Sequence, residues 1–380
     1  MAISLIELRG TPRERGRHYG EAAGPRVRAS IDYYAAAFAR SSGLDWPEVM
    51  ARARRWLPLV EDFAPDLVEE MAGVAEGAGV DPLEVLALNA RGEIVYDHTF
   101  ARIDPAPDCG SSAECTSLAL LPPAAGDGHV YAAQNWDWRA EAVNWTVMLR
   151  IVQPPKPTVI MQVEAGQIGR HGANSAGIAL NANGLGGRFD NAIGIPQAFI
   201  RRRILDSDRF SDALDVPFRV RQQIAANLLL THRDGVSIDL ETTPARHRWL
   251  YPDDGLLVHA NHYQAGVPSQ LADSYRPFAV DSLYRTEVLR GRLRACVGEP
   301  DPDAVRKLIG DGLSDHFGHP DSVCSHPDPR EDPLLRSQTI VSSIVDLTTG
   351  AYFVSDGTPC DDGYTRLPWG LYDEPGEQAV

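Results

Sequence analysis

The stretch ECTSLALL at residues 114–121 decides the fold, together with QNWDW at residues 134–138. A strand-like run follows Cys115 directly, and a second run over 129–135 ends in a polar cluster flanked by aromatic residues. This is the pattern expected if cleavage of the Glu114–Cys115 bond makes Cys115 a new N-terminus and a nucleophile.

A cysteine nucleophile needs a base, because a free thiol has a pKa of about 8.5 and is mostly protonated at neutral pH. A histidine can act as that base. An N-terminal cysteine can instead use its own α-amine, whose pKa is about 7.7–8.0. Taken alone, Cys115 is as well explained as a small buried apolar residue, so its context has to decide.

Composition narrows the class of protein. The 380 residues carry a net charge of −16, which argues against nucleic acid or anionic membrane as partners, despite the basic run over 201–203. We see no signal peptide and no membrane-spanning run. Five cysteines without a CxxC pair predict neither a disulfide scaffold nor a structural zinc site, and a cytoplasmic location is expected.

The chain divides into two parts, a helical segment over residues 1–114 and a strand-rich segment over residues 115–380. Capping patterns predict helices that begin near residues 11, 45 and 81, and an apolar stripe predicts another over 67–75. Residues 104–112 are expected to form an exposed linker.

The second part predicts a layered α+β body with antiparallel strands, because no regular helical crossover separates neighbouring strands. The expected strands are 116–121, 129–135, 145–152, 158–164, 176–182, 256–261, 337–346 and 351–356. The expected helices are 197–205, 213–230, 280–294 and 301–309.

Several polar residues are candidates for the site. Asn135, Trp136 and Asp137 lie at a strand end. Asn135 and Trp136 are candidates for substrate binding. Asp137 either holds an α-ammonium group or orients substrate, or else is an ordinary turn aspartate. Asn261 closes an apolar run and is a candidate oxyanion donor, a role worth about 3–4 kcal/mol, or else a plain strand-end asparagine. Asn183, a further candidate for substrate binding, precedes a glycine-rich loop beside the expected substrate cleft.

We expect no cofactor and no metal. The glycine-rich loop at residues 184–187 has neither dinucleotide nor phosphate-loop spacing. His316, His319, Cys324 and His326 are close in sequence, but their spacing fits no standard zinc pattern.

These motifs together resemble the isopenicillin-N acyltransferase-like family of self-processing N-terminal nucleophile hydrolases. The segments that carry the resemblance are 10–20, 71–80, 86–91, 115–117, 134–138, 164–183, 261–262, 281–285, 313–324 and 357–359.

The resemblance implies a four-layer αββα sandwich of the N-terminal nucleophile hydrolase type. It implies that Cys115 is nucleophile and base, that Asn261 contributes to the oxyanion hole and that Asp137 orients the amine or substrate. Arg285 is a candidate for the family's active-site arginine, with substrate contact. Cleavage at Glu114–Cys115 would give an α-subunit and a β-subunit. Fungal members of the family have glycine before the nucleophile, and glycine would ease the acyl shift, whereas this chain has Glu114.

The expected activity is acyl transfer through a thioester on Cys115, from a small N-acyl amide or acyl thioester. Hydrolysis is favoured over transfer, since no nucleotide loop marks a coenzyme A site. Two alternatives stay open: an uncleaved papain-like hydrolase with His259 or His262 as base, and a non-catalytic binding protein of the same fold.

Overall fold

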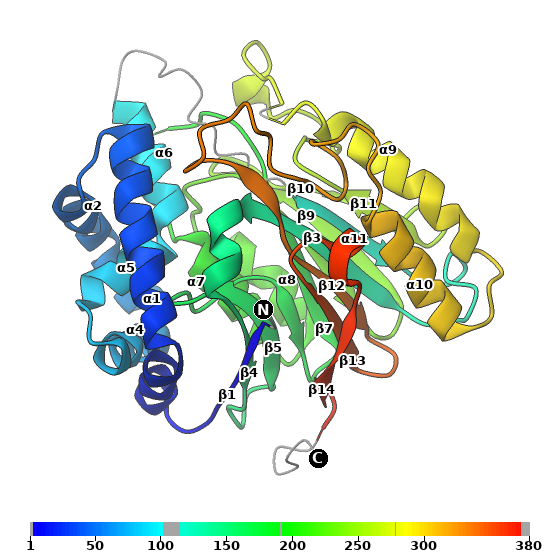
Figure 1. Cartoon of the computed structure of the whole chain (residues 1–380), viewed down its shortest axis with the longest axis horizontal. Helices are drawn as coiled ribbons and strands as arrows, with labels where there is room; N and C mark the ends of the chain where they lie inside the picture. Colours follow the sequence, from blue (N-terminus) through cyan, green and yellow to red (C-terminus); the bar gives the residue numbers. More distant parts are fainter. Residues whose placement is uncertain (1–2, 102–114, 191, 278, 374–380) are drawn as a thin grey trace.

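The computed structural model describes residues 3–101, 115–190, 192–277 and 279–373. Two β-sheets face each other and helices cover the outer side of each (Figure 1). The order of layers is therefore helices, sheet, sheet, helices, which confirms the expected αββα sandwich.

The first helical layer comes from the N-terminal part of the chain. Its elements are α1 (Pro12–Ser42), α2 (Trp46–Ala53), η1 (Arg54–Trp56), α3 (Leu57–Phe63), α4 (Pro65–Ala78), α5 (Pro82–Asn89) and α6 (Arg91–Ala101). Complete capping boxes at Thr11, Asp45 and Asp81 start α1, α2 and α5, as the sequence predicts.

Helices α1 and α4 pack with their backbones almost in contact. Gly16 and Gly20 on α1 face Gly73 and Gly77 on α4, and a Cβ built on any of the four would lie 1.9–2.3 Å from a backbone oxygen of the other helix. Only glycine fits at such an approach.

The larger sheet lies beneath this helical layer and has the order β1-β4-β5-β6-β7-β8-β9-β10. Its strands are β1 (Ser4–Leu8), β4 (Thr146–Ile151), β5 (Val159–Glu164), β6 (Gly172–Asn174), β7 (Ile178–Gly184), β8 (Ala226–His232), β9 (Val236–Thr242) and β10 (Arg248–Leu250). Only β1 and β4 pair in parallel, so the expectation of antiparallel pairing is confirmed for the rest. Helices α7 (Gln197–Leu205) and α8 (Phe210–Arg219) connect β7 to β8.

The smaller sheet has the order β11-β2-β3-β12-β13-β14 and is antiparallel throughout. Its strands are β2 (Cys115–Leu120), β3 (Tyr131–Arg139), β11 (Leu256–His259), β12 (Ser337–Asp346), β13 (Ala351–Asp356) and β14 (Thr365–Gly370). Helices α9 (Ser282–Leu293) and α10 (Pro302–Leu313) cover its outer face. The short elements η2 (Ala140–Trp145), η3 (Ser269–Leu271), η4 (Arg294–Cys296) and α11 (Pro359–Asp362) lie in connections.

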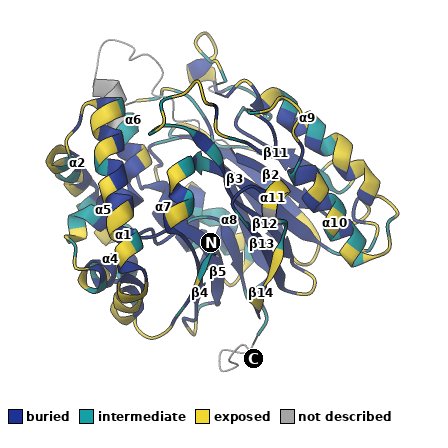
Figure 2. Cartoon of the chain, viewed as in Figure 1, coloured by how far each residue is buried: buried dark blue, intermediate teal, exposed yellow. Residues whose placement is uncertain are grey.

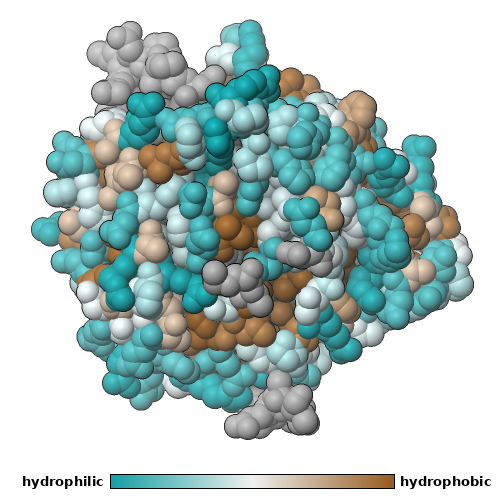
Figure 3. Space-filling model, viewed as in Figure 1, coloured by the Kyte–Doolittle hydropathy of each residue, from teal (hydrophilic) through white to brown (hydrophobic). Residues whose placement is uncertain are grey.

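The strands form the buried centre and the helices expose their outer faces (Figure 2). Apolar side chains of the two sheets, such as Met148, Ile160 and Val354, pack against each other between them. The face in Figure 3 is largely hydrophilic. Among the described residues, no helix combines the length and the apolar composition needed to cross a membrane.

The expected helix over 213–230 is wrong in its second half, where β8 begins at Ala226. Alanine and leucine favour helices in isolation, but Leu228 and Leu230 pack toward the helical layer while Leu229 packs toward the smaller sheet. A strand buried on both faces shows a continuous apolar run, which periodicity alone does not separate from a helix. Strands β1, β6, β9, β10 and β14 were not expected.

Candidate active site

Cys115 is the first residue of β2 and only 1% exposed. Its backbone N–H donates to Asn261 Oδ1 at 2.9 Å, and its carbonyl oxygen accepts from Arg285 Nη1 at 2.9 Å. Asn261 follows β11, the neighbour of β2, whereas Arg285 projects from α9. Both backbone polar groups of the expected nucleophile are thus fixed by side chains.

Arg285 organises this clamp. It is fully buried, and it donates to Asp281 Oδ2 at 2.6 Å, to Thr116 Oγ1 at 2.7 Å and to Asn261 Oδ1 at 2.9 Å. Because a guanidinium group can only donate, the Asn261 atom that it faces is the oxygen. The Asn261 nitrogen donates to Gly184 O at 3.0 Å. The expected oxyanion role of Asn261 and substrate contact of Arg285 stay predictions.

Asp137 lies on β3, which pairs with β2, and is fully buried. Its Oδ1 accepts from Thr339 Oγ1 at 2.5 Å, and its Oδ2 has no hydrogen-bond partner among the described residues. Burial raises the pKa of Asp137 to about 7, although the Arg285 charge and the Thr339 hydroxyl act to lower it. This carboxyl group therefore changes charge near neutral pH.

The thiol of Cys115 is protonated at neutral pH in the uncleaved chain. Burial, and then the Asp137 charge, raise the pKa of Cys115 to about 11. Arg170 and Arg201 act in the opposite direction, because positive charge favours the thiolate. Burial and the Asp137 charge therefore favour the neutral thiol, while the two arginine charges favour the thiolate.

Trp136 pairs with Cys115 across the β2–β3 ladder, and Arg170 lies 4.1 Å above its ring. His171 meets the same ring edge-on, with ring centroids 5.3 Å apart. Arg170, His171 and Arg201 are candidate site residues that the sequence did not predict. The signal for Arg201 was the basic run over 201–203 in an acidic chain. The structure divides that run, because Arg202 pairs with Glu70 and Arg203 with Asp66.

Asn135 and Asn183 lie near the site, but their amides bind the protein itself. Asn135 Nδ2 donates to Leu313 O at 2.8 Å and Val323 O at 2.7 Å, and its Oδ1 accepts from Ser342. Asn183 Nδ2 lies within hydrogen-bond distance of Ser117 Oγ and two further acceptors. Substrate contact by either residue stays a prediction, while both visibly join layers of the fold.

The two histidines of the papain-like alternative are engaged elsewhere. His259 Nδ1 bonds Ala260 O at 2.9 Å and its Nε2 bonds Glu241 Oε1 at 3.1 Å. Burial lowers the pKa of His259, but the nearby Asp239 and Glu241 carboxylates outweigh it and raise that pKa overall. His262 Nδ1 bonds Ser282 Oγ at 2.7 Å, and burial lowers the pKa of His262 to about 4.

Glu114 and the expected linker over 104–112 lie outside the described residues. The division into residues 1–114 and 115–380, and cleavage between them, therefore stay predictions. Strand β1 shows that the N-terminal part is not only helical, since it pairs with β4 in the larger sheet.

Comparisons with known proteins show the family of this chain. The model of the family described as acyl-coenzyme A:6-aminopenicillanic acid acyl-transferase matches residues 124–348. The chain is 29% identical over 258 residues to the 40 kDa form of acyl-coenzyme A:6-aminopenicillanic-acid-acyltransferase from Emericella nidulans, which covers 68% of each chain.

Solved structures give lower similarity. A Caenorhabditis elegans N-acylethanolamine-hydrolyzing acid amidase ortholog has 13% identity and a TM-score of 0.43, with 62% of this chain and 93% of that chain covered. Penicillin V acylase from Agrobacterium tumefaciens has 15% identity and a TM-score of 0.38, with coverages of 64% and 83%. The family match includes Asp137, Asn261 and Arg285 and begins nine residues after Cys115. Because it spans more than half of the sequence, the chain belongs to the acyl-coenzyme A:6-aminopenicillanic acid acyl-transferase family.

Proposed function

We propose that this chain cleaves itself before Cys115 and then uses that residue, as an N-terminal nucleophile, to hydrolyse or transfer the acyl group of a small amide or thioester. Membership of the family makes it an acyl-transferring enzyme. The observation that carries the finer proposal is the clamp on Cys115, whose nitrogen and carbonyl are each fixed by a buried side chain.

In the first step, the Cys115 sulfur attacks the carbonyl carbon of Glu114. The Glu114–Cys115 amide bond breaks as the acyl group moves to sulfur, and the nitrogen takes up the thiol proton. Water then hydrolyses the thioester, which gives a Glu114 carboxylate, a free thiol and an α-amine on Cys115. Asn261 already holds that nitrogen before cleavage, so the new amine is formed in position.

In turnover, the α-amine takes the thiol proton and the sulfur attacks the substrate carbonyl. The leaving amine or thiol departs with the proton from the ammonium group, and water or an acceptor amine then takes the acyl group. Cleavage supplies the base that the buried thiol lacks, since the α-amine has an ordinary pKa of about 7.7–8.0. Arg170 and Arg201 favour the negative charge on sulfur.

Around Cys115, several buried polar atoms have no hydrogen-bond partner among the described residues. They are Trp136 Nε1, Asp137 Oδ2, both ring nitrogens of His171, and the Nε atoms of Arg170 and Arg201. Buried polar groups in folded proteins nearly always have partners. We therefore propose that a polar substrate bearing a carboxylate completes this set, next to the two guanidinium groups.

Intact mass measurement tests self-cleavage. We expect the wild-type chain to split before Cys115, and Cys115→Ala to remain whole with an unchanged melting temperature. An active wild-type enzyme that remains one chain would contradict the proposal and favour a papain-like mechanism. The papain-like alternative would use His262 as a base, so His262→Gln tests it. We expect this variant to cleave itself normally, because the His262 ring is engaged with Ser282 rather than with Cys115.

Activity assays test the substrate class. N-acyl amino acids and their methyl esters share the scissile amide and differ in the carboxylate. We expect Arg201→Gln to raise KM for the acids and to leave KM for the esters nearly unchanged. An equal change for both would remove the carboxylate proposal while leaving self-cleavage intact. Hydrolysis releases the free acid of the acyl group without an added amine. Transfer forms an acylated amine only when an acceptor amine is added, so the two products distinguish the reactions.

A further inference from the structure

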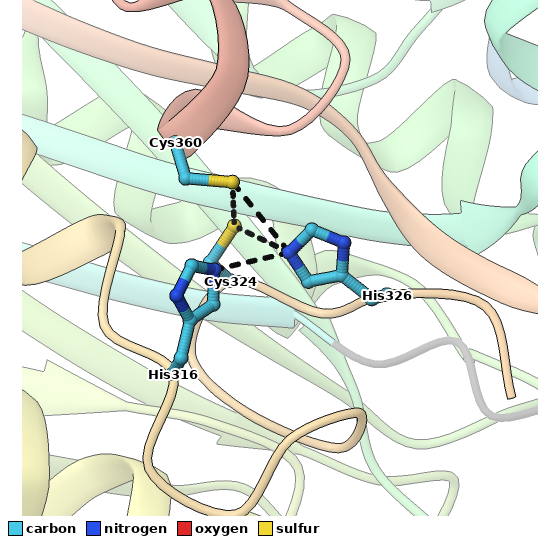
Figure 4. Close-up of side chains that lie close together, drawn as sticks. All are labelled: His316, Cys324, His326 and Cys360. Atoms are coloured by element: carbon cyan, nitrogen blue, oxygen red, sulfur yellow. Dashed lines mark hydrogen bonds between the residues drawn. The ribbon is translucent and has the colours of Figure 1, made fainter.

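A second group of reactive side chains lies outside the active site. His316, Cys324, His326 and Cys360 converge from three separate segments, and one ligand atom from each lies within 4.8 Å of the others (Figure 4). His316 follows α10, Cys324 and His326 precede β12, and Cys360 belongs to α11. The spacing of the first three residues predicts no standard zinc site, and nothing in the sequence connects Cys360 with them.

Four of the six separations between ligand atoms in this tetrad are close to those of a tetrahedral site, and all six are at most 4.8 Å. For typical zinc–sulfur and zinc–nitrogen bonds of about 2.3 and 2.0–2.1 Å, tetrahedral angles require S–S, S–N and N–N separations of about 3.8, 3.6 and 3.3 Å. The two sulfur atoms are 3.6 Å apart. His326 Nε2 lies 3.6 Å from Cys324 Sγ, 3.5 Å from Cys360 Sγ and 3.0 Å from His316 Nε2.

The donor atoms select the kind of ion. Two cysteine sulfurs and two imidazole nitrogens are a common ligand set of structural zinc, whereas magnesium and calcium prefer oxygen. A sulfur–sulfur separation of 3.6 Å is far longer than the 2.05 Å of a disulfide. Cys324 and Cys360 are therefore free thiols, and the Nε2 atoms of His316 and His326 lie 3.0 Å apart.

The backbone positions these ligands before any ion arrives. Cys324 N donates to Asp315 O at 3.0 Å, which holds Cys324 beside the residue that precedes His316. His326 N donates to Pro320 O at 3.0 Å, and Ser322 Oγ donates to Cys324 O at 2.6 Å. Cys324 is buried, whereas His316 and Cys360 are exposed, so an ion can enter from solvent.

We propose that His316, Cys324, His326 and Cys360 bind one zinc ion, which ties α11 to the segment that precedes β12. No step of the acyl transfer involves this site.

The segment that precedes β12 is hydrogen-bonded to residues of the candidate active site. Val323 O accepts from Asn135, and Ser325 N donates to Thr339 Oγ1 at 3.0 Å, the hydroxyl that in turn donates to Asp137. The zinc ion would therefore hold in place the backbone on both sides of Cys324. Its contribution is to stability, because an ion that binds only the folded state stabilises it.

The test uses full-length protein without an affinity tag, freed of metal by a chelator under reducing conditions and titrated with Co²⁺ alone. We expect one Co²⁺ per chain, with visible bands of tetrahedral cobalt and near-ultraviolet bands of cobalt–thiolate. Zn²⁺ should displace it and raise the melting temperature. Cys360→Ser and His326→Gln should lose these bands, while Cys296→Ala, which removes a thiol outside the tetrad, should keep them.

Four results would overturn the proposal. The first is the absence of thiolate bands in the reduced wild-type protein. The second is full binding by Cys360→Ser, and the third is loss of binding in His319→Gln but not in His316→Gln. The fourth is a stable Cys324–Cys360 disulfide that excludes zinc. Thiol counting on protein purified without reductant would detect this disulfide. Because these readouts are spectroscopic, they are independent of self-cleavage and of turnover.

Discussion

Replacing Asn261 by alanine is the sharpest test of the clamp on Cys115. The change removes the acceptor of the Cys115 N–H, a partner of Arg285 and the donor to Gly184 O. A buried N–H without a partner costs about 1–3 kcal/mol. If that cost falls on the transition state for the acyl shift, cleavage slows by about 5- to 150-fold, since 1.36 kcal/mol corresponds to tenfold.

The assay is cell-free translation followed by time-resolved intact mass, because cleavage during expression would hide the rate. Asn181→Ala is the matched control. Asn181 Nδ2 donates to Ala133 O at 3.1 Å and Leu118 O at 3.4 Å, so it joins the same strands without touching Cys115. We expect both variants to lose stability and only Asn261→Ala to cleave slowly. Cleavage of folded Asn261→Ala within about twofold of wild type would refute the reasoning.

Three further predictions follow from charges and packing. The pKa of Asp137 is raised above its unfolded value, so the unfolded state binds fewer protons and stability falls as pH rises from about 4 to about 7. Thermal melts across that range should show a smaller fall in melting temperature for Asp137→Asn than for the wild type. An equal fall in both proteins would mean that another group causes it. Arg285→Lys keeps a charge beside Asp281 but cannot reproduce the hydrogen bonds to Thr116 and Asn261. Urea unfolding should therefore show a free energy of unfolding lower by about 2–4 kcal/mol, and self-cleavage should be slower. Unchanged self-cleavage would count against the clamp. Gly77→Ala brings a Cβ within 2.1 Å of Arg17 O and should lower the melting temperature. The control is Gly291→Ala on α9, where the new Cβ meets nothing within 4 Å and the melting temperature should not fall. Similar melting temperatures for the two variants would refute close α1–α4 packing.

Local sequence determined the elements whose signals are local. Side chains three residues apart make the capping boxes at Thr11, Asp45 and Asp81, so the starts of α1, α2 and α5 are visible without a structure. The same holds for β12 and β13, whose predicted bounds are those observed. Motif order likewise indicated the family and pointed to Cys115, Asp137 and Asn261 as a group.

Tertiary structure decided what depends on residues far apart in sequence. The Ala-Leu run of β8 became a strand because both of its faces are covered, which local propensity does not encode. Arg285 reaches Cys115 only because α9 lies across the end of β2, and Arg170 reaches Trp136 only across the two sheets. Cys360 lies beside Cys324 and His326 because β13, the strand before it, pairs with β12, the strand that follows them. Sequence motifs therefore pointed to Cys115 as the candidate nucleophile and predicted its strand. The packing of the layers set the partners around Cys115 and brought together the four side chains proposed to bind zinc.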